Sequence, residues 1–117
     1  MLRQKRESEY EEALNNIQRG DKRGKTKLAW LMLSGDDRDE DKAVVMLEER
    51  TKERDAEAMW MLGLCCEFGI GTEQELERAR SLYQQSSTKK NPVGMYLAQC
   101  NSFERRNGIL HIYCLRN

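Results

Sequence analysis

The sequence predicts an all-α protein, a short α-solenoid in which about six helices stack as antiparallel pairs. The first observation is an internal repeat: Ala13, Ala43 and Ala79 each precede an apolar residue by four positions, and they follow one another after 30 and then 36 residues. The second is composition, because one proline among 117 residues and many strong helix formers favour helices. The third is that glycines or capping residues separate the periodic segments. Two-helix repeats of about this length are typical of α-solenoids.

The first two helices are expected over residues 1–19 and from about 22 to 34. The first segment has an apolar stripe made of Tyr10, Ala13, Leu14 and Ile17. Gly20 suits the left-handed backbone that often ends a helix. Asp21 is a suitable capping residue for the helix that follows it.

The third and fourth helices are expected after an acidic turn at residues 36–41. Acidic side chains there suit the positive end of the next helix dipole. The third helix would bury a face made of Ala43, Val44, Met46 and Leu47. Asp55 is expected to cap the fourth helix, which ends near Gly69. Gly63 in its interior costs about 1 kcal/mol relative to alanine, so it indicates that a neighbouring backbone approaches closely.

The last two helices are expected to begin near residues 72 and 92, with a polar loop over 86–91 between them. Residues 72–75, Thr-Glu-Gln-Glu, match the capping-box pattern and predict a helix start there. Pro92 suits the first turn of the last helix, where a missing N–H does no harm. The β-branched and aromatic stretch 108–115 fits a short strand, a capping tail or a disordered end. We therefore predict a helical repeat domain over 1–107 and a C-terminal tail over 108–117.

The composition argues against several classes of protein. No apolar run approaches the ~18 residues that a membrane-spanning helix needs, and the charged N-terminus has no apolar core of a signal peptide. Formal net charge is zero, so nothing draws the whole chain toward nucleic acid. Residues 36–57 nevertheless hold ten acids and five bases, whereas residues 88–117 hold five bases and one acid. We expect a cytoplasmic protein without a membrane or nucleic-acid partner.

Four cysteines are expected to be reduced, namely Cys65, Cys66, Cys100 and Cys114. No C-x-x-C pair is present, and Cys65 and Cys66 point about 100° apart on a helix, which disfavours chelation. The sole histidine, His111, lies in an apolar stretch, and no nucleophile–base pair or phosphate-binding loop is visible. The sequence therefore predicts no enzyme, no catalytic residue, no cofactor and no metal site.

One pattern competes with this interpretation. Asp37, Asp39, Asp41 and Glu48 have the spacing of an EF-hand calcium loop. The sixth position of that loop should be glycine, but here it is Lys42. The alternative is a solvated acidic turn followed by a helix, and it accounts for more of the residues. A calcium-responsive module stays a remote alternative.

The central repeat resembles the Sel1-like repeat, a relative of the tetratricopeptide repeat. The matching positions are Ala58, Leu62, Gly63, Gly69, Gly71, Ala79 and Tyr83. The departures are Cys66 for a tyrosine, Arg78 for a lysine, Leu82 for an aromatic residue, and Ser86 and Ser87 for two alanines. The resemblance covers about 22–104 and is closest over 55–87. It implies a right-handed helical stack that acts as an adaptor or scaffold and carries no catalytic residue.

The second, fourth and sixth helices supply candidate binding residues. Trp60 and Leu64 lie on a different helix face from Ala58 and Leu62. The residues that share this face across the repeats, and that we predict to contact a partner, are Trp30, Leu33, Trp60, Leu64, Glu67, Tyr96 and Phe103. Aromatic residues on the concave face of a solenoid can hold a peptide, since tryptophan and tyrosine dominate interface hot spots. The alternative is that they pack between repeats.

The sequence thus predicts a protein–protein interaction module that binds a protein or peptide on its concave face. A second hypothesis is a self-associating structural unit, a possible homodimer that pairs through the repeat ends or the tail. Two full repeats are fewer than the three or so that a solenoid usually needs, which favours some form of completion by another chain.

Overall fold

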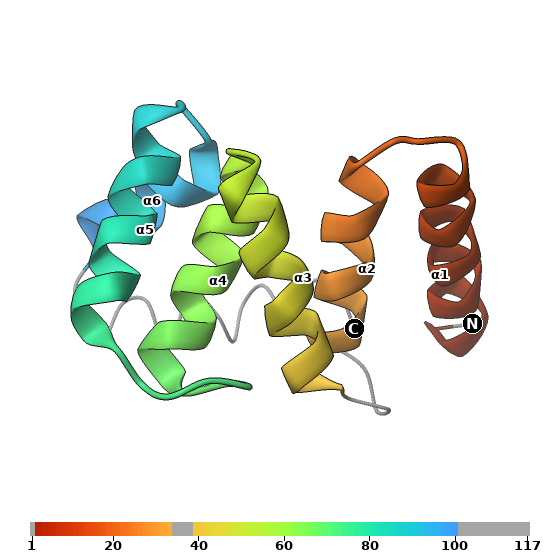
Figure 1. The fold of residues 1–117 in the computed structure, drawn as a ribbon, viewed down its shortest axis with the longest axis horizontal. Helices are drawn as coiled ribbons and strands as arrows, with labels where there is room; N and C mark the ends of the chain where they lie inside the picture. The colour runs from red at the N-terminus through yellow and green to blue at the C-terminus, as the bar shows by residue number, and fades with distance from the viewer. Residues whose placement is uncertain (1, 34–38, 101–117) are drawn as a thin grey trace.

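Six α-helices account for the described part of the chain, residues 2–33 and 39–100 of a computed structural model (Figure 1). They are α1 (Leu2–Gln18), α2 (Arg23–Leu33), α3 (Glu40–Lys52), α4 (Ala56–Phe68), α5 (Leu76–Thr88) and α6 (Pro92–Gln99). The described residues contain no strand. The prediction of an all-α stack of six helices is confirmed. The predicted tail over 108–117 and the domain boundary before it lie outside the described residues.

The helices form a stack in which each one packs against the next along the chain. In addition, α2 contacts α4, and α4 contacts α6, so the even-numbered helices make a continuous layer. The molecule measures 35 × 29 × 26 Å, and α1 lies at the opposite end of its longest axis from α5 and α6 (Figure 1). Because α4 has helices on several sides, every one of its residues from 58 to 67 is buried.

Three turns, each leading from an odd-numbered to an even-numbered helix, share one backbone geometry. The residues with positive φ in these turns are Gly20 (86°), Arg54 (67°) and Lys90 (61°). The residue that follows each of them accepts a bond on its side chain from the backbone N–H two positions later, at 3.0, 3.1 and 3.0 Å; these residues are Asp21, Asp55 and Asn91. Such caps satisfy N–H groups that the first helical turn leaves unbonded. The predicted caps Asp21 and Asp55 are confirmed.

These turns set the register of the repeats at 34 and then 36 residues. The spacing of 34 corrects the 30 residues inferred from Ala13 and Ala43. In the structure Ala13 corresponds to Leu47, one helical turn beyond Ala43. All three residues are buried, because positions four apart lie on the same helix face. A repeated alanine therefore identifies the buried face of each helix. It does not show which of two residues one helical turn apart occupies the equivalent position in the next repeat.

Small residues recur at the point where each turn brings two helices together. A Cβ atom on Gly24 would lie 2.7 Å from the Ala13 carbonyl oxygen, and one on Gly94 would overlap the Ser86 hydroxyl. The corresponding residue of α4 is Ala58, which is fully buried. The repeat thus requires a small residue on the even-numbered helix at this crossing.

The start of α5 differs from the prediction. The capping box at residues 72–75 does not form, because α5 begins at Leu76 and its N-cap residue, Glu75, makes no side-chain capping bond. Instead this segment is held across the end of α4. The Glu75 N–H donates to the Cys66 carbonyl at 2.8 Å, and Gln74 Nε2 donates to the Glu67 carbonyl at 2.8 Å. Tertiary contacts to α4 thus replace local capping.

Candidate functional site

The two tryptophans of the predicted binding face are buried and contact each other. Trp30 on α2 and Trp60 on α4 are 4% and 5% exposed. Their ring centroids are 5.4 Å apart at an interplanar angle of 65°, an edge-to-face arrangement. Trp60 Nε1 donates to Glu57 Oε2 at 3.1 Å. This geometry favours the packing alternative for both rings, while their contact with a partner stays a prediction.

The other predicted residues divide into buried and accessible ones. Leu33, Leu64 and Glu67 are buried, and Phe103 lies outside the described residues. Tyr96 on α6 is half exposed, at 49%. The structure therefore brings five of the seven predicted residues into the interior of the even-numbered layer and leaves Tyr96 at its surface.

Met95 is an accessible residue that the sequence argument missed. It is 41% exposed and precedes Tyr96 on α6. Its counterpart in the preceding repeat is Met59, which is 4% exposed. The alignment of the repeats therefore gives no signal that Met95 is accessible.

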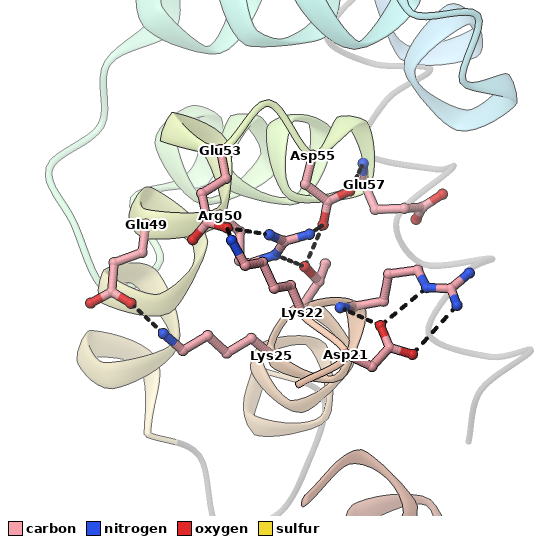
Figure 2. A network of polar contacts seen from close by, with 10 residues as sticks. Asp21, Lys22, Lys25, Glu49, Arg50, Glu53, Asp55 and Glu57 are labelled. Carbon is pink, nitrogen blue, oxygen red and sulfur yellow. Dashed lines mark hydrogen bonds and ion pairs between the residues drawn. The ribbon is translucent and has the colours of Figure 1, made fainter. Parts of the chain in front are cut away.

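A buried polar network joins α2, α3 and the N-terminus of α4 (Figure 2). At its centre is Arg50 of α3, which is only 7% exposed. The Arg50 guanidinium donates to Thr26 Oγ1 at 3.1 Å, to Glu53 Oε2 at 2.9 Å and to Asp55 Oδ2 at 3.1 Å. The Thr26 hydroxyl in turn donates a short hydrogen bond to Asp55 Oδ2. Hydrogen bonds to these three acceptors offset the desolvation of the buried guanidinium.

Two solvent-exposed ion pairs flank this network and link α2 and the turn before it to the end of α3. Lys22 Nζ lies 3.0 Å from Glu53 Oε2, and Lys25 Nζ lies 2.8 Å from Glu49 Oε2 (Figure 2). The bond from Lys22 holds the pKa of the Glu53 carboxyl below its usual value, despite the opposing effect of desolvation. Such exposed pairs contribute little to stability. We therefore attribute most of the polar stabilisation between α2, α3 and the start of α4 to the Arg50 network.

Glu57 connects α4 to the turn before α6, much as the Arg50 network connects α2 to the turn before α4. Its Oε1 atom accepts a bond from Asn91 Nδ2 at 2.7 Å, while Oε2 accepts the bond from Trp60. Asn91 also caps α6, through bonds from the N–H groups of Val93 and Gly94. The turn before α6 is thereby tied to α4. The even-numbered layer is held at both junctions by polar contacts as well as by packing.

The pattern that resembled a calcium loop is largely helical. Helix α3 begins at Glu40, and Asp39 acts as its N-cap by accepting a bond from the Lys42 N–H at 3.3 Å. An EF-hand loop would need non-helical backbone over most of 37–48, so this segment does not have that geometry. Asp37 itself lies outside the described residues. Within residues 2–33 and 39–100, no three acidic, histidine or cysteine side chains are grouped as metal ligands would be.

The two adjacent cysteines are buried thiols. Cys65 and Cys66 are free and have almost no exposed surface. Burial raises the pKa of the Cys65 thiol to about 12, and it also raises that of Cys66. A thiol with a raised pKa is a poor nucleophile at neutral pH. Both therefore behave as small core residues.

Comparison with known families decides the class of the protein. The family model of the Sel1 repeat matches residues 24–49 and 56–91, more than half of the chain. The chain belongs to the Sel1 repeat family. The first match covers α2 and most of α3, and the second covers α4, α5 and the turn before α6. Each Sel1 match thus contains one even-numbered helix and the odd-numbered helix after it.

The family gives the function in general terms. Sel1 repeats are generally protein–protein interaction modules and form a non-catalytic type of scaffold. No curated protein and no solved structure gave a significant match to this Sel1 protein. Among the helices described, none is long and apolar enough to cross a membrane.

Proposed function

We propose that this Sel1 repeat protein is an adaptor or scaffold that binds a protein or peptide on the layer formed by α2, α4 and α6. The observation that carries the proposal is that α2, α4 and α6 form a continuous layer that ends in a half-exposed aromatic residue, Tyr96. Tyrosine contributes a large contact area with little loss of conformational freedom, so it is a common interface residue.

The predicted site residues then have two kinds of role. Tyr96 contacts the partner directly, and Met95 extends that contact. The buried residues shape the layer from within; they are Trp30, Leu33, Trp60, Leu64 and Glu67. Phe103 follows α6 along the chain and is retained as a contact residue. We also retain 1–107 as the repeat domain and 108–117 as its tail.

The test is a selection of peptides from a random displayed library on the intact chain. Peptides that bind the wild-type protein are then measured against Tyr96→Ala and against Leu76→Ala. Leu76 is a suitable control because it is equally exposed, at 51%, but lies on α5. We expect Tyr96→Ala to weaken binding about tenfold, a typical hot-spot effect, and Leu76→Ala to leave it unchanged. Equal binding by all three proteins, or no enriched peptide, contradicts this binding face.

Self-association is a second candidate, favoured by the exposed Met95 and Tyr96. At the opposite end of the stack, α1 carries exposed Glu12 where α3 and α5 carry buried Met46 and Leu82, although its Leu14 is also 45% exposed. Two adjoining exposed apolar residues therefore make α6 the first candidate for a homodimer contact, and the tail is the second. Sedimentation velocity over a wide concentration range detects such a dimer. A dimer lost in Met95→Ala/Tyr96→Ala indicates α6, one lost on deletion of 108–117 indicates the tail, and a monomer at every concentration excludes both.

A further inference from the structure

Charged residues are unequally divided between the two ends of the helices. The turns before α2, α4 and α6 lie along one edge of the molecule, at the top of Figure 1, whereas the start of α3 and the segment between α4 and α5 lie along the opposite edge. The first edge, residues 18–23, 52–57 and 88–93, holds seven bases and four acids, and we call it the basic edge. The opposite edge, residues 39–41 and 69–77, holds six acids and no base.

The acids of the basic edge are used within the protein, whereas most of its bases are not. Asp21 and Glu53 form ion pairs with neighbouring cations (Figure 2). Asp55 belongs to the Arg50 network, and Glu57 accepts hydrogen bonds from two other side chains. Five exposed bases take part in no ion pair or side-chain hydrogen bond among the described residues; they are Arg19, Lys52, Arg54, Lys89 and Lys90. Their charges are therefore free to bind a partner.

Two of these cations occupy backbone positions that favour glycine. The φ angle is 67° at Arg54 and 61° at Lys90, and the equivalent residue of the first turn is Gly20. Left-handed backbone disfavours a residue with a Cβ atom but not glycine. Neither cationic side chain offsets this strain by a polar contact within the described part of the chain. Such strained residues concentrate at functional sites, so the combination indicates that both side chains serve a contact outside the chain.

The basic edge fits an acidic protein segment better than a nucleic acid. The three turns contain no aromatic residue, so they offer no ring on which a base could stack. The side chains of Asp21 and Glu53 are 35% and 37% exposed, and they would repel a continuous row of phosphates. A polypeptide can instead place its carboxylates opposite the free cations and neutral side chains opposite these two acids.

We propose that the basic edge binds an extended acidic segment of a protein partner, whose carboxylates pair with Arg54, Lys90 and the other free cations of the three turns. The longest dimension of the molecule is 35 Å, so at roughly 3.3 Å per residue an extended segment of about 11 residues spans the edge. The inference goes beyond the proposed function, because it adds a second interaction surface at the ends of the helices and does not depend on the layer formed by α2, α4 and α6.

The test uses two labelled peptides of about 12 residues, a length that spans the edge. One alternates glutamate with serine and glycine, and its matched peptide has glutamine in place of every glutamate. Fluorescence anisotropy with the intact chain measures both dissociation constants. We expect the glutamate peptide to bind at least about tenfold more tightly at low salt. The difference should disappear at about 1 M salt, where the screening length is about 3 Å.

Glycine substitutions separate binding from folding. Arg54→Gly/Lys90→Gly removes two charges and relieves the left-handed backbone, so the thermal unfolding midpoint should stay the same or rise. The same variant should bind the glutamate peptide about five- to tenfold more weakly at low salt. The matched control is Lys42→Gln/Arg80→Gln, which removes two exposed cations of α3 and α5 outside the basic edge. It changes the net charge equally and should weaken binding by less than about twofold.

Each other result overturns the inference in a recognisable way. Equal binding of the two peptides, or equal weakening by the two double variants, shows that only overall charge matters. Unchanged binding in the glycine variant, with or without a lower unfolding midpoint, shows that Arg54 and Lys90 do not contact the partner. Tighter binding of an RNA oligonucleotide of equal charge assigns the edge to nucleic acid.

Two further results keep this inference distinct from other modes of binding. Self-association that both high salt and the glycine variant abolish would show that the acidic edge of a second copy occupies the basic edge, and it overturns the separate partner. Library peptides whose binding needs Tyr96 but not Arg54 or Lys90 support the proposed function alone. If the glutamate peptide binds as expected while no library peptide needs Tyr96, the basic edge stands and the proposed binding layer fails.

Discussion

The ring of Tyr83 lies directly against the backbone of Gly63. A Cβ atom on Gly63 would be 2.6 Å from Tyr83 Cε1 and 2.9 Å from Cδ1, closer than such carbon atoms pack. This contact joins α5 to α4, and Tyr83 is only 1% exposed. The glycine inside α4 thus makes room for an aromatic ring, whereas the sequence had predicted the close approach of a neighbouring backbone.

Gly63→Ala is therefore expected to destabilise the protein by about 1–2 kcal/mol. Overpacking a core costs about 1–3 kcal/mol, and the better helix propensity of alanine returns up to about 1 kcal/mol. Urea unfolding followed by circular dichroism measures the loss. The control is the same substitution in a Tyr83→Leu background, where the clash is absent. A loss in that background as large as in the wild type contradicts the assigned contact.

Arg50→Met is expected to lower the free energy of unfolding by about 3 kcal/mol, at the low end of the range for removing one partner of a buried ion pair. The reason is that Asp55, whose side chain is 13% exposed, would keep its charge without the guanidinium. The matched control is Lys25→Met, which breaks the exposed pair to Glu49 across the same two helices. That change should cost less than about 0.5 kcal/mol. Equal losses in urea unfolding would show that the Arg50 network is no stronger than a surface pair.

Trp60→Ala is expected to cost about 3–5 kcal/mol of stability, because it leaves a cavity beside Trp30. Tyr96→Ala should change the unfolding midpoint little, since half of that side chain is already in water. Thermal unfolding of the two variants makes the comparison. If Trp60→Ala instead unfolds like the wild type and only binds peptide more weakly, Trp60 is a groove residue, as the sequence first suggested.

Cys65 is expected to resist thiol reagents at pH 8 in the folded protein. Its pKa of about 12 in the folded state keeps it protonated, and burial also blocks access. Mass spectrometry of peptides after brief alkylation should show Cys100, which is partly exposed, modified well before Cys65. The ordinary pKa is 9.0 in the unfolded chain, so the protein should lose stability as the pH rises from about 9 toward 12, where unfolding releases a proton. Rapid labelling of Cys65 under native conditions contradicts both points.

Local signals predicted the ends of most helices. Gly20 takes the left-handed conformation, Asp55 and Asp21 cap the helices they precede, and Pro92 occupies the first turn of α6. These features depend on residues close together in the chain, so the sequence alone contains them. The even-numbered helices were also aligned correctly, because their apolar segments are long and distinct.

Contacts between distant residues decided the features that the sequence argument missed. The pattern Thr-Glu-Gln-Glu at 72–75 fits a capping box, but bonds to α4 hold this segment in another conformation. Arg50 looks like an ordinary surface residue in the sequence, and it is buried only because Thr26 and Asp55 surround it.

The sequence by itself determined the class of fold, the order of the helices and which helix faces are equivalent in successive repeats. These features follow from periodicity and local capping. The tertiary structure decided how much of each face is accessible. Periodicity places Trp60 and Tyr96 at the same position of successive repeats, but only packing buries the first and leaves the second half exposed. The physical reason is that a helix face is covered by its neighbours in the stack, and a single helix does not encode how many neighbours it has.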